Sequence, residues 1–319
     1  MRKVRRVSFT EGKITEDIVK GTALSSLICL ASIYIPVIGF LLALLIPLPL
    51  LFYRSKLGRK SGIIIFAATI LIIMLAVRSV SIDLFFFAEL LFLGFMLSEF
   101  FHFNLSVEKT VIYTSCTVLA TSGMGIMLYS NIQGAGIYSL ASEYVAANLK
   151  LAMDLYKNMG VSEENIRMIS DSLDQIQYVF IRIIPALIIA STLFVSWTSL
   201  LISKPALVKK NLSYPDFGSL NLWKAPEHIV WVVIASSLML FIPDKTIKVI
   251  GINILLILMV IYFFQGIAIV SFYFKKKQLP QALKIFLYSL IALQHIIFLL
   301  VIGLGFFDVW LNVRKIENS

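Results

Sequence analysis

The sequence predicts an all-α fold: a polytopic transmembrane helical bundle of eight or nine spans, with an amphipathic helical segment between the fifth and sixth spans. Of its 319 residues, 59% are hydrophobic and only 14% are charged, which is too apolar for a water-soluble chain of this length. The mean hydropathy is +0.90. The basic residues fall in the gaps between apolar runs. A lipid bilayer is therefore the solvent that fits the chain.

The apolar runs give the span count. A transmembrane helix needs roughly 20 predominantly apolar residues. Nine stretches qualify, over residues 18–35, 37–53, 62–78, 82–103, 110–130, 176–203, 227–243, 248–274 and 284–306. The first two are short and abut at Pro36 and Gly39, so they form either a tight hairpin of two spans or one span plus a re-entrant segment. The predicted count is eight or nine.

In a soluble domain, a formal net charge of +10 would indicate a nucleic-acid partner. Here the basic residues occupy the predicted loops between spans instead. We therefore expect no nucleic acid partner. The positive-inside rule places the basic N-terminus, with Arg2, Lys3, Arg5 and Arg6, in the cytoplasm. Nine alternating spans would then leave Arg314 and Lys315 on the outer side.

The expected organisation has six parts. They are a basic cytoplasmic N-terminus (1–17), five spans (18–130), extracytoplasmic amphipathic helices (131–175), a sixth span (176–203), a cytoplasmic loop (204–226) and a C-terminal three-span segment (227–319).

The segment 131–175 alternates polar and apolar residues at helical spacing. A first apolar stripe ends at Gly160, and Ser162 is the expected N-cap of a second helix. The stripes consist of Leu140, Tyr144, Leu151, Leu155 and Met159, then of Ile166, Ile169, Leu173, Ile176 and Phe180. The second stripe continues into the sixth span. We expect two amphipathic helices, either flat in the headgroup region or folded over the mouth of the bundle.

Motifs for catalysis are missing from the sequence. It contains no Gly-rich phosphate loop, and neither a serine nor an aspartyl intramembrane protease site can be assembled. The histidines His102, His228 and His295 have no metal-ligand spacing. We expect no enzyme, no cofactor and no metal. Asp308 near Trp310 is the one candidate for lipid chemistry, and a lone carboxylate at an interface is usually solvated.

Polar residues within spans are costly in hydrocarbon and raise a functional hypothesis. Glu89 and Arg182 each lie about 9 Å inside the outer end of a predicted helix, at about 1.5 Å per residue. They either face a polar ligand together or form a structural ion pair. Gln265, Gln294 and His295 make a second candidate ligand-binding group, for which interhelical hydrogen bonds are the alternative explanation.

Two further features of the spans have simple interpretations. Glu99 and His102 lie near the cytoplasmic end of the fourth span, where snorkelling accounts for them. Gly21, Ser25 and Cys29 form a small-residue ridge on the first span, which lets another helix approach closely. Its partner is either internal or another membrane subunit.

Several short segments along the chain are distinctive when taken together. They are Gly160 with Ser162–Glu164, IPAL at 184–187, WKAPE at 223–227 with Trp231, YFFQG at 262–266, and GFFDVW at 305–310 with Arg314 and Lys315. With these segments the chain resembles the YybS-like family of predicted bacterial membrane proteins. The resemblance implies a multi-pass protein of the bacterial inner (plasma) membrane and supplies no catalytic residues.

The first two thirds of the chain combine a small-residue first span, a turn at Pro36 and Gly39, and a second span containing Pro47 and Pro49. In this order of features they look like the substrate-binding (S) components of energy-coupling factor vitamin transporters. It implies ligand binding near the outer face and partner docking through the ridge. The leading hypothesis is thus a small-molecule-binding transport component. The alternative is a scaffolding membrane protein that binds partner proteins and no ligand.

Overall fold

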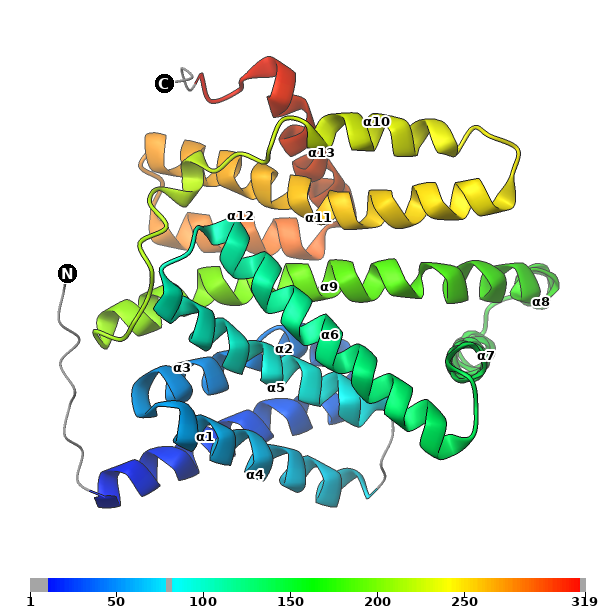
Figure 1. Cartoon of the computed structure of the whole chain (residues 1–319). Helices are drawn as coiled ribbons and strands as arrows, with labels where there is room; N and C mark the ends of the chain where they lie inside the picture. The colour runs from blue at the N-terminus through cyan, green and yellow to red at the C-terminus, as the bar shows by residue number, and fades with distance from the viewer. Residues whose placement is uncertain (1–10, 79–81, 316–319) are drawn as a thin grey trace. The chain divides into compact units, whose positions relative to one another are not determined.

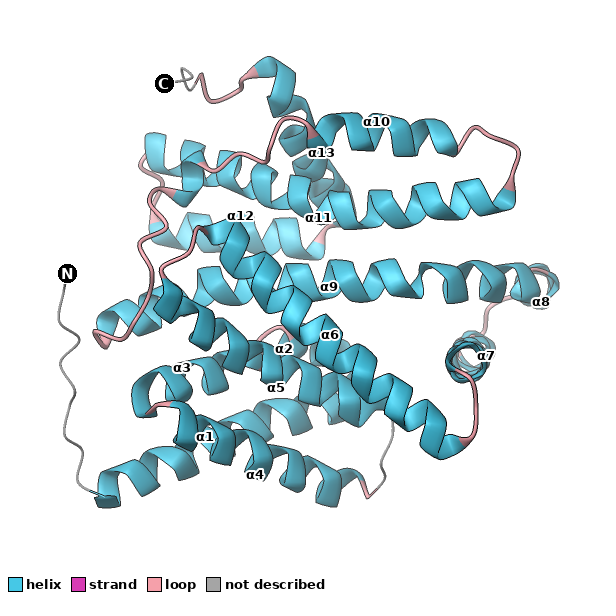
Figure 2. Ribbon diagram, viewed as in Figure 1, coloured by secondary structure: helices cyan, strands magenta, loops and turns pink. Residues whose placement is uncertain are grey.

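The computed structural model describes residues 11–78 and 82–315. Within these ranges the chain is helical and contains no strand (Figures 1 and 2). The predicted all-α class is confirmed. The basic residues Arg2, Lys3, Arg5 and Arg6 lie outside the described ranges.

The chain divides into two compact units that interleave along the sequence. Unit 1 comprises residues 1–129 and 191–217, and unit 2 comprises residues 130–190 and 218–319. The helix α9 (Leu173–Lys209) belongs to both, because its residues up to Ala190 lie in unit 2 and those from Ser191 lie in unit 1.

Unit 1 is built from the first five helices, from α6 up to Tyr129 and from the later part of α9. These helices are α1 (Glu11–Tyr34), α2 (Pro36–Ala43), α3 (Pro47–Leu57), α4 (Arg59–Val77), α5 (Ile82–Phe100) and α6 (Val107–Gln133), with the 3-10 helix η1 (Phe101–Phe103) after α5. Lys56 pairs with Asp17 at 2.6 Å and Arg59 pairs with Glu99 at 3.0 Å. The start of α1, the end of α3, the start of α4 and the end of α5 therefore meet at one end of unit 1.

The predicted second span, 37–53, is two short helices. After the turn at Ile35, where the Ser32 hydroxyl donates to the Gly39 carbonyl at 2.7 Å, α2 runs for only eight residues. The helix restarts at Pro47, which has no N–H to continue the hydrogen bonds of a preceding helix but suits a first helical position. Neither piece alone is long enough to span a bilayer.

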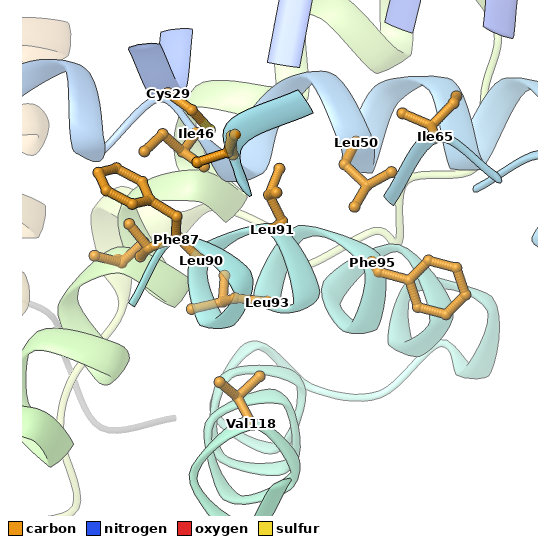
Figure 3. Close-up of a cluster of buried hydrophobic side chains, with 12 residues drawn as sticks. Cys29, Ile46, Leu50, Ile65, Phe87, Leu90, Leu91, Leu93, Phe95 and Val118 are labelled. Atoms are coloured by element: carbon orange, nitrogen blue, oxygen red, sulfur yellow. The ribbon is translucent and has the colours of Figure 1, made fainter. Parts of the chain in front are cut away.

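The core of unit 1 lies between α1, α3, α4 and α5 (Figure 3). Leu50, Ile65 and Leu91 are fully buried there. A side chain at Gly94 would overlap the carbonyl oxygen of Pro47, so α5 and α3 touch backbone to backbone. Close contacts at small residues are the usual means by which membrane helices associate.

Unit 2 contains the remaining helices and the first part of α9. They are α7 (Ile137–Asn158), α8 (Glu163–Asp171), the 3-10 helix η2 (Leu220–Leu222), α10 (Ile229–Met239), α11 (Lys245–Lys276), α12 (Gln281–Leu293) and α13 (His295–Leu311). The longest helix lying wholly within it is α11, which is capped by Asp244, whose carboxylate accepts from the Ile247 N–H at 2.9 Å.

The helices α12 and α13 are bent by 99° at Gln294. Glycines at the crossing of α13 and α11 allow direct backbone contact, because a Cβ at Gly266 would overlap the carbonyl of Val301 and one at Gly305 that of Tyr262. Beyond α13, the Val313 carbonyl accepts from the Tyr273 hydroxyl at 2.8 Å. The chain after α13 thus returns to the end of α11 from which α12 departs.

The predicted span count is not confirmed. Among the described residues, six helices are long and apolar enough to cross a membrane, or seven if the bent pair α12 and α13 is one span. The difference arises at the interrupted stretch 37–53 and at 227–243, where α10 has only 11 residues. Hydropathy alone detects these stretches but not the breaks within them.

Two amphipathic helices fill the segment between α6 and α9, as predicted. Gly160 takes a left-handed conformation with φ of 74°, and the Ser162 hydroxyl accepts from the Asn165 N–H at 3.5 Å as the N-cap of α8. The second stripe does not run straight into the sixth span. The helix breaks at Ser172, whose hydroxyl donates to the Met168 carbonyl at 3.1 Å.

The position of the C-terminal segment differs from the nine-span prediction. That prediction separates Arg314 from the loop at 204–226 by a membrane. Instead, the Arg314 guanidinium donates to the carbonyls of Asn221 and Trp223, both at 3.0 Å. Arg314 and this loop therefore lie at the same end of unit 2, because the bent pair α12 and α13 turns back.

Candidate functional site

Glu89 lies in the middle of α5, where three helices of unit 1 bring polar groups together. Its carboxylate accepts a hydrogen bond from the Thr192 hydroxyl of α9 at 3.1 Å, and the Ser122 hydroxyl of α6 is a second partner. Thr192 is buried, whereas Glu89 and Ser122 are partly exposed. The three side chains form the Glu89 site.

The Glu89 site can accept hydrogen bonds through its carboxylate. The described part of unit 1 places no lysine or arginine within ion-pair distance of this carboxylate. A carboxylate inside a span is costly unless it is paired or serves a ligand or ion path. The arrangement can accept further hydrogen bonds or a cationic group.

Arg182 lies on the part of α9 that belongs to unit 2. Its guanidinium donates to the Tyr178 carbonyl at 3.1 Å and its central carbon lies 3.4 Å from the centre of the Tyr178 ring. Asn253 of α11 donates to the Arg182 carbonyl at 3.1 Å. A cation over an aromatic face is partly stabilised without a carboxylate. Glu89 belongs to unit 1 and Arg182 to unit 2. The predicted site in which both side chains face one ligand therefore stays a prediction.

Gln265 lies in a buried polar cluster of unit 2. Its amide N–H donates to the Asp308 carboxylate at 3.2 Å, and its amide oxygen accepts from the Ala225 N–H at 3.2 Å. Arg314 donates to the same Asp308 oxygen at 2.9 Å. The exposed fractions of Gln265, Asp308 and Arg314 are 1%, 1% and 4%. We call Gln265, Asp308, Arg314 and Ala225 the Asp308 cluster.

The Asp308 cluster corrects one interpretation of the sequence. Asp308 was expected to be a solvated carboxylate at the interface, but it is buried and paired. Its second oxygen accepts from the Val313 N–H at 2.9 Å, so the backbone turns after α13 and carries Arg314 back onto it. Both Asp308 oxygens and both terminal nitrogens of Arg314 have partners, whereas the Arg314 Nε has none among the described residues. Hydrogen bonds of this kind make a buried charge pair tolerable.

The structure does not group Gln294 and His295 with the partners of Gln265. Both residues are exposed at the bend between α12 and α13, where Gln294 is the last residue before α13. The Phe298 N–H donates to the Gln294 carbonyl at 3.0 Å, which begins the first turn of that helix. Their role in ligand binding stays a prediction.

The small-residue ridge faces the interior of unit 1. Ser25 and Cys29 are fully buried. A Cβ at Gly21 would lie 2.9 Å from the side chain of Ile65 and 3.0 Å from that of Tyr53. The helices α3 and α4 of the same chain therefore cover the ridge. The partner of the ridge is thus internal, and not another membrane subunit.

Sequence reasoning missed the main ion pair of unit 1. Arg54, expected in a loop, and Glu99, expected to snorkel, form a salt bridge. Arg54 is 5% exposed and also donates to the Ser98 carbonyl at 2.8 Å. The one sequence signal for this pair is that both residues flank apolar runs at the same predicted membrane face.

The described residues contain no group of three or more His, Cys, Asp or Glu side chains placed to hold a metal ion. Both cysteines are free, Cys29 buried and Cys116 exposed.

Outside the spans, the Tyr214 hydroxyl donates to the Leu200 carbonyl at 3.3 Å. Burial raises the pKa of Tyr214 above its ordinary value.

Comparison with known proteins gives a family. The family model described as "Predicted membrane protein (DUF2232)" matches residues 23–309. The chain belongs to this family. A relative from Bacillus subtilis (strain 168), described as "Uncharacterized protein YybS", is 24% identical over 313 residues, covering 95% of this chain and 99% of the relative. No solved structure matches the chain.

Membership of the DUF2232 family makes the chain an integral membrane protein. The predicted family resemblance is confirmed. Three of the segments that carried it, at 223–227, 262–266 and 305–310, supply Ala225, Gln265 and Asp308, and Arg314 comes from the residues that follow. Gln265 contacts Ala225 and Asp308, which are 40 and 43 residues away in the sequence, so these segments meet in the Asp308 cluster.

Proposed function

We propose that the chain is a non-enzymatic component of a small-molecule transport system, and that the Glu89 site of unit 1 binds the ligand. The observation that carries the proposal is a partly exposed carboxylate within a span that has hydroxyl partners from two other helices. Such a group favours a ligand with a cationic or hydrogen-bond-donating group. The distant likeness to energy-coupling factor S components supports the same function.

The contrast with two other acids, Glu99 and Asp308, strengthens the proposal. Glu99 and Asp308 each have an arginine partner, so structural pairing accounts for both. An ion pair with arginine or lysine within the described part of unit 1 does not explain the presence of Glu89 in a span. Arg182, Gln265, Gln294 and His295 are secondary candidates, and Arg182 is the first to test because of its predicted depth.

Native mass spectrometry of the full chain, purified from its native membrane, tests this function. We expect a bound molecule on the wild type that is lost in Glu89→Gln, since the amide removes the charge and keeps the shape. Ser196→Ala is the matched control, because Ser196 of α9 bonds to Ser115 of α6 at 3.1 Å without a charged group. An empty wild type, or a ligand retained in Glu89→Gln, would contradict the proposal.

The proposed topology has the N-terminus and the C-terminal segment in the cytoplasm of a bacterial inner membrane. Eight crossings, of which 37–53 is broken and 227–243 is short, are followed by α12 and α13 as a re-entrant hairpin. Contact of Arg314 with residues 221 and 223 supports this, because it moves Arg314 and Lys315 to the side of the basic loops. The distribution then agrees better with the positive-inside rule.

The topology is tested by labelling single cysteines with a membrane-impermeant maleimide in intact spheroplasts. The variants are Asn312→Cys and Tyr138→Cys in a Cys116→Ser background. We expect labelling at position 138 and, at position 312, labelling only after lysis. Labelling of both in intact cells would return the C-terminal segment to the outer side.

One observation favours the scaffolding alternative. Arg314 donates hydrogen bonds to the loop after α9, and Lys224 of that loop donates to Asn312 at 3.4 Å. The loop and the C-terminal segment therefore form one surface. Affinity purification separates the two functions. Recovery of an ATPase pair with a membrane coupling subunit favours transport, whereas recovery of envelope or division proteins favours scaffolding.

A further inference from the structure

The helix α7 has three distinct faces, since successive residues are about 100° apart around a helix. The packing face contains Ser142, Val145 and Met153. The apolar face contains Tyr144, Leu151, Leu155 and Met159. The charged face contains Glu143, Lys150, Asp154 and Lys157. Each face is separated from the next by about a third of a turn.

Contacts within unit 2 fix the rotation of α7 about its own axis. The Gln177 amide of α9 donates to the Ser142 hydroxyl at 3.1 Å. Val145 and Met153 on the same face are 8% and 7% exposed. The packing face is therefore the face that α7 turns toward its own unit.

The apolar face points elsewhere. Leu151, Leu155 and Met159 are 63%, 62% and 76% exposed. Large apolar side chains grouped on one exposed face usually mark a protein or membrane contact. A helix folded onto the helices of its own unit would use such a stripe as its packing face, and α7 does not.

The position of α7 in the chain selects the membrane as the contact. Three residues separate it from α6, which is long and apolar enough to span, and α8 leads directly into α9. In Figure 1, α7 and α8 are viewed end-on, whereas α10 and α11 of the same unit are viewed lengthwise. A helix that runs crosswise at the end of spanning helices lies in the plane of the bilayer surface.

We infer that α7 is an interfacial helix whose apolar face inserts at the boundary of headgroups and acyl chains, and that its partner is lipid. The charged face then points to water. It carries two acidic and two basic side chains, so attachment depends on apolar burial and not on anionic lipid. This inference is independent of the Glu89 proposal.

Spin labels at single cysteines test the inference in the full chain, in a Cys116→Ser background, reconstituted in phosphatidylcholine vesicles. We expect the label in Leu155→Cys to collide severalfold more with oxygen than with a water-soluble nickel chelate. The label in Asp154→Cys, its neighbour on the charged face, should show the reverse. Replacing a quarter of the lipid with phosphatidylglycerol should leave both values unchanged.

Two results would overturn the inference. Equal access of the nickel chelate to positions 154 and 155 would place the apolar face in water. Exclusion of both reagents from position 155 would mean that protein covers the face. Leu151→Cys repeats the measurement on the same face, so that a folding defect in one variant does not decide the result.

Discussion

Two kinds of acid occupy the spans. Glu99 in unit 1 and Asp308 in unit 2 each have an arginine partner that also donates to backbone carbonyls. Glu89 has hydroxyl partners instead. Glu89 and Glu99 lie on the same helix, about 15 Å apart at 1.5 Å per residue. The paired acids contribute to the fold through their arginines, whereas Glu89 is the residue for which we propose a ligand.

The largest expected effect is the loss of Arg314. Arg314→Ala leaves the buried Asp308 without a cation and releases the carbonyls of residues 221 and 223, so we expect destabilisation of about 3–5 kcal/mol. Titration of the protein in mixed micelles with SDS, followed by circular dichroism, measures it. The double variant Asp308→Asn with Arg314→Gln should be more stable than the sum of the single changes predicts. Additive effects would show that the two side chains do not interact.

Arg54→Ala should have a somewhat smaller effect, about 3 kcal/mol, the lower end for a broken buried pair. The reason is that Glu99 keeps a second cation, Arg59, at 3.0 Å. Arg59→Ala is the control and should change stability by less than about 1 kcal/mol, since the Arg59 side chain is 69% exposed. The same titration applies. If both variants behave alike, the burial of Arg54 has no energetic role.

The glycine contact between α11 and α13 tests whether packing, as well as charge, holds the Asp308 cluster. Gly305→Ala places a Cβ against the Tyr262 carbonyl, and we expect a loss of about 1–3 kcal/mol from overpacking. Gly303→Ala, on the same helix, meets nothing within 4 Å and should be neutral. Equal stability of the two variants would argue against a close crossing.

The smallest expected effect on stability is that of Glu89→Gln. The amide oxygen can still accept from Thr192, so the free energy of unfolding should change by less than about 1 kcal/mol. A loss similar to that of Arg314→Ala would place Glu89 with the structural acids and weaken the proposed ligand site. Thermal unfolding of the purified variant beside the wild type provides a second measurement.

The sequence predicts the fold where one signal suffices. Apolar runs at 62–78 and 110–130 locate α4 and α6, and Ser162 after Gly160 locates the start of α8. Helix breaks within apolar runs are not predicted, because hydropathy is the same on both sides of Ile46 or Gln294. Prolines at 36 and 47 show where a break is possible but not which way the chain turns.

The polar pairs are harder to predict. Periodicity tells which face of a helix is polar, but a partner 40 to 103 residues away depends on how the loops fold back. Arg54 looked like a loop residue because it ends an apolar run, and its burial follows from the close packing of α3 against α5. Gln265 was found because an amide within a span is conspicuous, whereas Asp308 and Arg314 were placed at a membrane surface.

The Asp308 cluster also has a consequence for biosynthesis. Residues 221 and 223 are made 93 and 91 residues before Arg314. At about 5–20 residues per second they wait roughly 5 to 20 s for their donor. In the later part of that interval, once Gln265 has been made, the loop at 221–225 and Gln265 are present without the cation that completes the cluster. A chain that stalls in this window lacks the donor for the Asp308 carboxylate and for the carbonyls of residues 221 and 223.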